Sequence, residues 1–571
     1  MTQTVHLGDL TVTIDGIDLR DIRWHRHEAV RRIYPVFQDR NWTNRPFRIE
    51  TQQVSEGADS VTLVATGTGS FDAEPLRWRV EADIRPTGIV YRFSAEASSS
   101  FLRNRLGMCV LHPMSAAGAL VSVEHVDGTV EAGELPTNIS AFQPFIDLRA
   151  VTHELPNGGQ ANVRLLGETY EMEDHRNWTD ASFKTYCTPI TLPFPVEVGQ
   201  GDRIEQTVEV SFIGGSSAAE AVDAPIEINV DETLTELPGL GVCLSADDLA
   251  KQDAQLLDLS ALQLDHLRVD IDPTSPTSVT TLTRASGIAT ALGAALHVAA
   301  TCSGPSDLAT LADLPAEVIA PIRTLYVLSS ADKVTPDTWS TEVPDILGES
   351  WSGVLLGGGT DLYFTELNRE PPDPLAFDAL NFSLNPQVHA FDDRTLIQNT
   401  MTQQVVAEQA PRLTDPARLS VSPISLRPRF NPNATDPASD VSNTDLPNDV
   451  DARQQTYFAA NWTAMSIKYL AAAGTVDTAT YFETFGWKGL GEPDEPFPVW
   501  QVFASLAEMT HAQRCTSSDP ESVDALIARN ADQRIALVAN WTADEQTIHI
   551  GALGSHVIPP QSLTLIPLPL N

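Results

Sequence analysis

Three side chains that can accept and release protons, Glu366, His389 and Glu483, stand near the ends of hydrophobic runs in the second half of the chain. Hydrolysis of an ester or an acetal needs a base that activates water and an acid that protonates the departing oxygen. It also needs fixed donors or cations where negative charge develops. Two carboxylates and an imidazole supply the first two roles, so we predict these three residues to be catalytic.

Polar and aromatic residues accompany each of the three in the sequence. The predicted substrate-binding residues in this half of the chain are Asn368, Arg369, Asn385, Gln387, Trp487 and Lys488. Other acids also follow hydrophobic runs: Asp270, Asp272, Asp361 and Asp392. The aromatic side chains around Glu483 either stack on a sugar-like ring or serve packing alone. An unpartnered carboxylate would be costly to bury among them, which favours a functional role for Glu483.

A second cluster of charged residues lies between residues 171 and 184, mixed with aromatic side chains. In an extended strand Glu173, His175 and Asn177 would share one face, with Asp174 and Arg176 on the other. Two interpretations remain open. The cluster is either a satisfied polar network at a domain interface or part of the site, and in the second case Glu173 and Arg176 contact the substrate.

The elements that must position the catalytic candidates form a repeating strand–helix pattern between residues 226 and 510. Eight apolar, β-branched runs alternate there with helical stretches, as expected for a parallel sheet with crossover helices. The runs begin at Gly241, His266, Ala295, Thr324, Gly353, Leu380, Leu419 and Thr480. This pattern predicts a (β/α)₈ barrel, in which function sits at the carboxyl ends of the strands. Glu366 would then follow the fifth strand, His389 the sixth, and Glu483 would end the eighth.

The barrel is flanked by β-type sequence, so the predicted fold is a multidomain α/β plus all-β architecture. Short alternating runs fill residues 1–217 and predict an antiparallel β-sandwich with one short helix at 26–34. Residues 511–571 predict a small C-terminal β domain. A polar loop at 431–449 follows the seventh barrel strand and is predicted to lie at the rim.

Composition narrows the partners. There are 36 basic and 76 acidic residues, giving a net charge of −40. Such a surface repels phosphate backbones and anionic lipid, so we expect neither nucleic-acid nor membrane partners. The five cysteines are scattered, which indicates buried thiols in a reducing compartment, and the amino-terminal sequence resembles no signal peptide. We therefore predict a cytoplasmic protein. Nucleotide loops, nucleophile elbows and metal-ligand spacings are absent from the sequence, so no cofactor and no metal site are predicted.

Both halves contain long motifs. They are FLRNRLGMCVLHP from Phe101, YEMEDHRNWTDASFKTYCTP from Tyr170, YFTELNREPP from Tyr363 and FSLNPQVHAFDD from Phe382, with TYFETFGWKG in the last barrel element. Together these motifs resemble the bacterial D-apionate lactonase family. The resemblance implies a β domain, a barrel and a C-terminal β domain. It also implies hydrolysis of D-apionolactone to D-apionate. One departure is His175, where we expect glutamine.

From the residues, the working scheme has one of Glu366 and Glu483 activating water while the other handles the proton of the ring oxygen. His389, Asn368 and Arg369 would stabilise the oxyanion. The alternative is a glycoside hydrolase acting on a furanoside or apioside with paired carboxylates. The commonest barrel glycosidases carry these after strands four and seven, whereas the count here gives five and eight. A third possibility is a sugar-binding protein without catalysis. The oligomeric state is open.

Overall fold

The computed structural model describes residues 2–45, 47–71, 74–216, 225–251, 256–414, 418–429, 446–447 and 449–570. These residues form two compact units. The first comprises residues 2–176 and 181–216, and the second comprises residues 225–570 together with the short segment 177–180. This segment, which interrupts the first unit in the sequence, therefore belongs to the unit that contains the barrel.

The first unit is all-β, as predicted. Its strands form one 17-stranded sheet in which every pairing is antiparallel. Alternation along the strands buries one face, as in β8, and a large apolar core runs through the unit beside two small buried clusters. The strands are β1 (Thr2–Leu7), β2 (Leu10–Asp15), β3 (Asp18–Trp24), β4 (His27–Asp39), β5 (Phe47–Glu56), β6 (Val61–Phe71), β7 (Glu74–Arg85), β8 (Gly88–Ala97), β9 (Phe101–Pro113), β10 (Leu120–His125), β11 (Val130–Glu134), β12 (Phe145–Glu154), β13 (Gln160–Leu166), β14 (Tyr170–Asp174), β15 (Ser182–Tyr186), β16 (Val196–Val198) and β17 (Arg203–Ile213).

The predicted helix at 26–34 is wrong. Residues His27–Asp39 form β4, which pairs with β3 on one side and with β9 on the other. The charged residues of this stretch gave it an apparent helical spacing. Ladder hydrogen bonds to two neighbouring strands outweigh that weak local preference.

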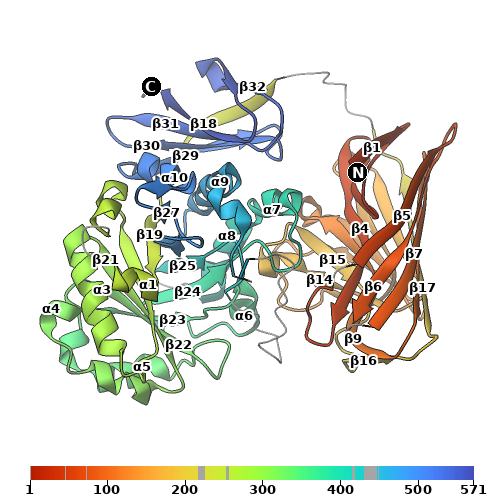
Figure 1. The fold of residues 1–571 in the computed structure, drawn as a ribbon. Helices are drawn as coiled ribbons and strands as arrows, with labels where there is room; N and C mark the ends of the chain where they lie inside the picture. The colour runs from red at the N-terminus through yellow and green to blue at the C-terminus, as the bar shows by residue number, and fades with distance from the viewer. Residues whose placement is uncertain are drawn as a thin grey trace. The chain divides into compact units, whose positions relative to one another are not determined.

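The second unit contains a closed barrel of eight parallel strands, and all eight predicted runs are among them (Figure 1). The strands are β19 (Gly239–Leu244), β20 (His266–Ile271), β21 (Ala295–Cys302), β22 (Ile322–Ser329), β23 (Leu355–Gly359), β24 (Ala379–Leu384), β25 (Leu419–Ile424) and β26 (Thr478–Glu483). The helices around them are α1 (Ala246–Ala250), α3 (Ser278–Leu292), α4 (Ala316–Ile319), α5 (Trp339–Leu347), α6 (Phe364–Arg369), α7 (Asp393–Asn399), α8 (Thr402–Thr414), α9 (Tyr457–Ala473) and α10 (Val499–Leu506). The predicted (β/α)₈ architecture is confirmed.

The last barrel strand ends in a bulge. Val242 of β19 pairs with Tyr481 and the next residue, Cys243, pairs with Glu483, so the ladder skips Phe482. Phe482 has a positive φ of 51°. A bulge of this kind re-aims the following side chain, which here is Glu483.

A seven-stranded sheet completes the second unit, in the order β33-β32-β18-β29-β30-β31-β34. Its strands are β18 (Ile226–Glu236), β29 (His511–Ser517), β30 (Val523–Arg529), β31 (Arg534–Asn540), β32 (Gln546–Ile550), β33 (Ser555–Ile558) and β34 (Ser562–Leu568). β18 pairs with β29 and β32 in this sheet, whereas the sequence placed it in the barrel segment. A buried ion pair between Lys468 of α9 and Asp524 of β30 joins this sheet to the barrel helices.

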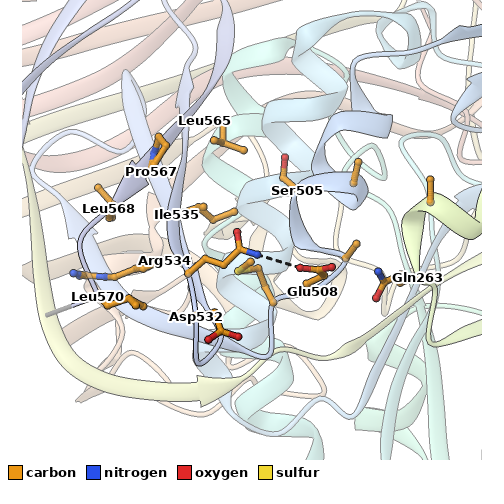
Figure 2. Close-up of a pocket in the computed structure, with 15 residues that line it drawn as sticks. Gln263, Ser505, Glu508, Asp532, Arg534, Ile535, Leu565, Pro567, Leu568 and Leu570 are labelled. Carbon is orange, nitrogen blue, oxygen red and sulfur yellow. Dashed lines mark hydrogen bonds between the residues drawn. The ribbon is translucent and has the colours of Figure 1, made fainter.

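A pocket of about 700 Å³ lies where α10 meets β31 and β34 (Figure 2). Its lining includes Gln263, at the amino-terminal side of β20, so this pocket is not at the carboxyl ends of the barrel strands. Most of the predicted rim loop at 431–449 lies outside the described residues. All five cysteines are free, and Cys243 alone among them is partly exposed. In the described part of the chain, no helix combines the length and apolar character needed to cross a membrane.

Candidate active site at the carboxyl ends of the barrel strands

The predicted residues of the barrel come from three elements at its carboxyl-terminal face. Helix α6 follows β23 and carries Glu366, Asn368 and Arg369. The segment between β24 and α7 carries Asn385, Gln387 and His389, while Glu483 ends β26 and is followed by Trp487 and Lys488. Because the loops after barrel strands converge on one face, these elements meet at the mouth of the barrel.

His389 is held by a carboxylate that the sequence analysis did not assign to the site. Its Nδ1 donates to Oδ2 of Asp180 over 2.6 Å. Oδ1 of Asp180 accepts from Nδ2 of Asn399 at 3.0 Å, which fixes the carboxylate in turn. Asp180 is almost fully buried, and His389 is 17% exposed. An imidazole bound through Nδ1 to a buried carboxylate has its orientation and tautomer set, and its Nε2 is the atom suited to proton transfer.

The segment 177–180 also contacts helix α6. Nδ2 of Asn368 donates to Oδ1 of Asn177 at 2.8 Å. The guanidinium of Arg369 lies over the ring of Trp178 at 5.4 Å, and the same ring meets His389 edge-on at 5.3 Å. The segment 177–180 therefore links Asn368 and Arg369 of α6 to His389, which lies between β24 and α7.

Both candidate catalytic glutamates form ion pairs with lysines. Oε1 of the buried Glu366 lies 3.5 Å from Nζ of Lys333. Oε1 of Glu483 lies 2.8 Å from Nζ of Lys488, which also donates to Oδ2 of Asp449 at 3.0 Å. Trp487, in the loop between Glu483 and Lys488, has half of its surface exposed.

Gln387 is tied into the barrel by its amide. Nε2 donates to Oδ2 of Asp451 and to the Leu426 carbonyl, each at 2.6 Å. Burial raises the pKa of Asp451, but hydrogen bonds and the charge of Arg453 outweigh this and lower it to about 2. Asn385 accepts a bond from the Gln387 backbone N–H at 3.1 Å. These two residues order the segment that carries His389.

Four charged side chains at the same face form a closed ring of ion pairs, of which the sequence predicted only the two aspartates. Arg268 of β20 is fully buried and donates to Asp270 at 2.9 Å and to Asp361 at 2.8 Å. The outer oxygens of the two carboxylates accept from Arg429, Asp361 at 2.9 Å and Asp270 at 2.5 Å. Burial raises the pKa of Asp270, but the two arginines outweigh this and lower it. Both aspartates were candidates because they lie at the ends of predicted barrel strands, whereas nothing in the sequence marked either arginine.

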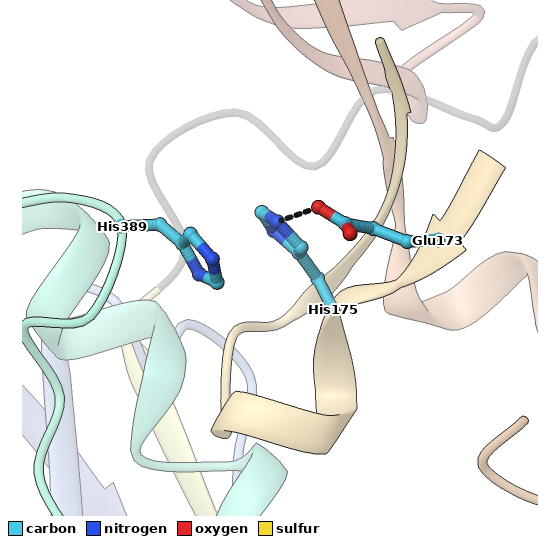
Figure 3. Close-up of side chains that lie close together, drawn as sticks. All are labelled: Glu173, His175 and His389. Atoms are coloured by element: carbon cyan, nitrogen blue, oxygen red, sulfur yellow. Dashed lines mark ion pairs between the residues drawn. The ribbon is translucent and has the colours of Figure 1, made fainter. Parts of the chain in front are cut away.

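Glu173 and Arg176 lie in the first unit, in two separate networks. The Glu173 carboxylate pairs with Nε2 of His175 at 3.3 Å (Figure 3) and with Nζ of Lys184 at 3.3 Å. Arg176 binds Asp174 through Nε at 2.8 Å and Nη2 at 2.6 Å. Its remaining donors reach carbonyl groups of residues 136–138. Arg176 is thus fully engaged within its own unit, as in the network interpretation.

The predicted alternation through this cluster holds only as far as Asp174. Strand β14 ends there, and His175–Trp178 form a 3₁₀ turn. Within either unit taken alone, no three His, Cys, Asp or Glu side chains of the described residues lie close enough to share a metal ion.

An eight-stranded α/β barrel with an oriented imidazole and two carboxylate–lysine ion pairs at its carboxyl-terminal face has the groups expected of a barrel hydrolase. The chain belongs to the D-apionate lactonase family: residues 1–215 match the N-terminal domain of that family and residues 240–511 its TIM barrel domain. A D-apionate lactonase of Brucella anthropi is 28% identical over 594 aligned positions, which cover 97% of this chain and 95% of that protein.

The solved structures that match this chain are much more distant. A GH30 endoxylanase from Clostridium papyrosolvens C71 has 10% identity and a TM-score of 0.39, covering 60% of this chain and 99% of that chain. A beta-arabinopyranosidase has 9% identity and a TM-score of 0.33, covering 99% of this chain and 98% of that chain. At these values the likeness carries no argument about the reaction.

Proposed function

We propose that this chain is a lactonase that opens D-apionolactone to D-apionate in the catabolism of apiose. Two lines support the proposal: membership of the D-apionate lactonase family and a relative of that name aligned over almost the whole chain. The observation that carries the mechanism is the Asp180–His389 pair at the barrel mouth. It differs from the scheme built on the sequence, in which a glutamate activates water.

His389 fits the role of general base better than either glutamate. The carboxylates of Glu366 and Glu483 each face a lysine ammonium at 3.5 and 2.8 Å. Each ion pair occupies one oxygen of its carboxylate and holds the side chain in place. The imidazole of His389 is instead backed by the carboxylate of Asp180, which stabilises the imidazolium once it forms.

The steps balance with one residue as base and acid. Nε2 of His389 takes a proton from water as the water oxygen attacks the lactone carbonyl carbon, giving a tetrahedral oxyanion. The bond between that carbon and the ring oxygen then breaks. The imidazolium returns its proton to the ring oxygen, which becomes the hydroxyl of the open-chain acid.

The remaining groups stabilise charge and hold the substrate. Arg369 and Asn368 present a guanidinium and an amide close to His389 through Trp178 and Asn177, and we assign them to the oxyanion. Glu366, Glu483 and Lys488 are assigned to the hydroxyl groups of the lactone. A fixed carboxylate accepts a strong hydrogen bond from a hydroxyl group, and an ammonium donates one. Asn385 and Gln387 position the His389 segment.

The test is acid release, followed with a pH indicator, when the purified protein meets D-apionolactone and a panel of aldonolactones. Fast release confined to branched or five-ring lactones supports the proposal. Release no faster than the spontaneous rate on every lactone rejects it and directs the search to furanosides and apiosides. The strand count weighs against that glycosidase alternative, since Glu366 follows the fifth barrel strand and Glu483 ends the eighth.

A further inference from the structure

The first unit holds a buried cluster of opposite charges that none of the steps above uses. Glu173 of β14 and Lys184 of β15 are direct cross-strand partners, and Oε1 of Glu173 lies 3.3 Å from Nζ of Lys184. Nη1 of Arg105, on β9, lies 3.6 Å from the same oxygen. His175 completes the set of donors around it (Figure 3). Three donor groups therefore converge on one oxygen of Glu173, at distances longer than good charge-assisted hydrogen bonds.

Two aromatic rings lie against the Arg105 guanidinium. It lies 3.6 Å from the ring centre of Tyr186 and 5.1 Å from that of Trp42. Trp42 has a φ of 64°, in the left-handed region that a bulky residue rarely adopts. Asp39 holds this loop, because its Oδ1 accepts the backbone N–H groups of Asn41 at 2.8 Å and Thr43 at 3.0 Å. The indole is thus held over the charged cluster at some conformational cost.

Two polar atoms of the cluster are buried without a hydrogen-bond partner among the described residues. Glu171 is fully buried, and its Oε1 accepts from the Tyr186 hydroxyl and from the Ile190 backbone N–H. Its Oε2 has no partner, and neither has Nε of Arg105. Buried donors and acceptors are normally satisfied, so an acceptor and a donor left over in one cluster indicate that something else binds there.

The charge balance identifies the class of ligand. Arg105 and Lys184 carry two positive charges, and Glu171 and Glu173 carry two negative ones. Burial raises the pKa of Glu173, but Lys184 and Arg105 outweigh this and hold it well below its ordinary value. A cluster without net charge, with both a donor and an acceptor to fill, suits hydroxyl groups, which donate and accept at once. The exposed edge fits too, since Trp42 meets Phe194 at 5.3 Å and Phe194 is half exposed.

We propose that the first unit carries a binding site for a neutral polyhydroxylated molecule, a sugar or sugar lactone, formed by Glu173, Arg105, Lys184 and Glu171 with Trp42 as its stacking face. Sugar rings place their apolar faces on aromatic side chains and their hydroxyl groups against fixed charges. Trp42 and the Glu173 cluster offer both within one unit.

The test is calorimetric titration of the full-length protein with D-apiose, a neutral pentose that has no lactone bond. We expect saturable binding that Glu173→Gln weakens about tenfold or more, because a hydrogen bond to a charged group contributes on that scale. Trp42→Ala should weaken binding several-fold through lost stacking. The matched control is Phe142→Ala, an exposed aromatic side chain of the same unit, which should change nothing.

Folding and the barrel site are controlled separately. If Glu173→Gln fails to give a cooperative thermal transition, Trp42→Ala decides, since Trp42 lies in a loop. His389→Asn should lose lactone hydrolysis and keep D-apiose binding. The inference is overturned if wild type shows no saturable binding, or if binding survives both Glu173→Gln and Trp42→Ala. Lactone hydrolysis without D-apiose binding would refute this inference and leave the proposed function intact. D-apiose binding without lactone hydrolysis would refute the proposed function and leave this inference intact.

Discussion

Replacement of Asp180 by asparagine isolates the interaction on which the proposed mechanism depends. Oδ2 of Asp180 accepts from Nδ1 of His389 at 2.6 Å, and Oδ1 accepts from Asn399 at 3.0 Å. An asparagine can still accept from Asn399. Its amide would then turn an N–H group towards Nδ1 of His389, which favours the tautomer with the proton on Nε2. That tautomer cannot take a proton from water.

The lost hydrogen bond sets the smallest effect expected, and the change of tautomer adds to it. A bond to a charged group contributes about 1.5–3 kcal/mol, which corresponds to a roughly 10- to 150-fold loss in kcat. His389→Asn removes the base itself and should cost about 10²- to 10⁴-fold. Because both residues act as one unit, Asp180→Asn should add little in the His389→Asn background.

The assay is initial-rate acid release from D-apionolactone at saturating substrate, with thermal unfolding confirming that each variant is folded. Asn399→Ala is a useful companion, because it removes the second bond to Asp180 without touching the imidazole and should cost less than Asp180→Asn. If Asp180→Asn stays within twofold of the wild-type kcat, the pair does not activate water. Full additivity of Asp180→Asn and His389→Asn would show that the two side chains act independently.

Three further predictions concern the two barrel glutamates, His297 and the net charge. Glu366→Gln and Glu483→Gln should each raise KM about tenfold with kcat nearly unchanged, since these side chains are assigned to substrate hydroxyl groups; a kcat loss beyond about a hundredfold would return the base role to a carboxylate. Acid should destabilise the barrel through His297, whose two ring nitrogens are buried without partners and whose pKa burial lowers well below the ordinary value. Below pH 6.5 the unfolded chain then binds a proton that the folded barrel does not, so the free energy of unfolding falls as pH falls. In urea unfolding, His297→Gln should reduce the decrease in this free energy between pH 7.5 and 5.5 by about 1.4 kcal/mol. An unchanged loss would show that His297 is protonated in the folded barrel. Finally, the charges of a chain with net charge −40 repel one another in the folded state. Raising NaCl from 10 to 500 mM shortens the Debye screening length from about 30 Å, so the thermal midpoint should rise by several degrees. A lower midpoint in salt would contradict this.

The barrel was predictable because its signal is local. Each barrel strand lies in a short run rich in apolar or small residues, and helical stretches separate these runs clearly, so all eight strands were found from the alternation of the two patterns. The positions of Glu366, His389 and Glu483 relative to those strands followed directly. Strand β4 was missed because its charged residues imitate a helical spacing, and only its pairing with β3 and β9 decides its conformation.

The partners in the site were not predictable in the same way. Asp180 lies 209 positions before His389 in the chain, and nothing in its neighbourhood distinguishes it from the other acids of its cluster. Arg268 was likewise hidden inside an apolar strand, although it closes the ring with Asp270 and Asp361. Residue type and strand position indicate which groups can do chemistry, whereas the pairs that orient them depend on contacts across the fold.

In the proposed reaction this protein adds water to the carbonyl carbon of D-apionolactone. The most direct measurement is hydrolysis in H₂¹⁸O, followed by mass spectrometry of the acid and its fragments at times when the spontaneous reaction is negligible. We expect rapid formation of D-apionate with one ¹⁸O atom, located in the carboxylate. Product formed no faster than without protein, or label found in the hydroxyl released from the ring, would contradict it.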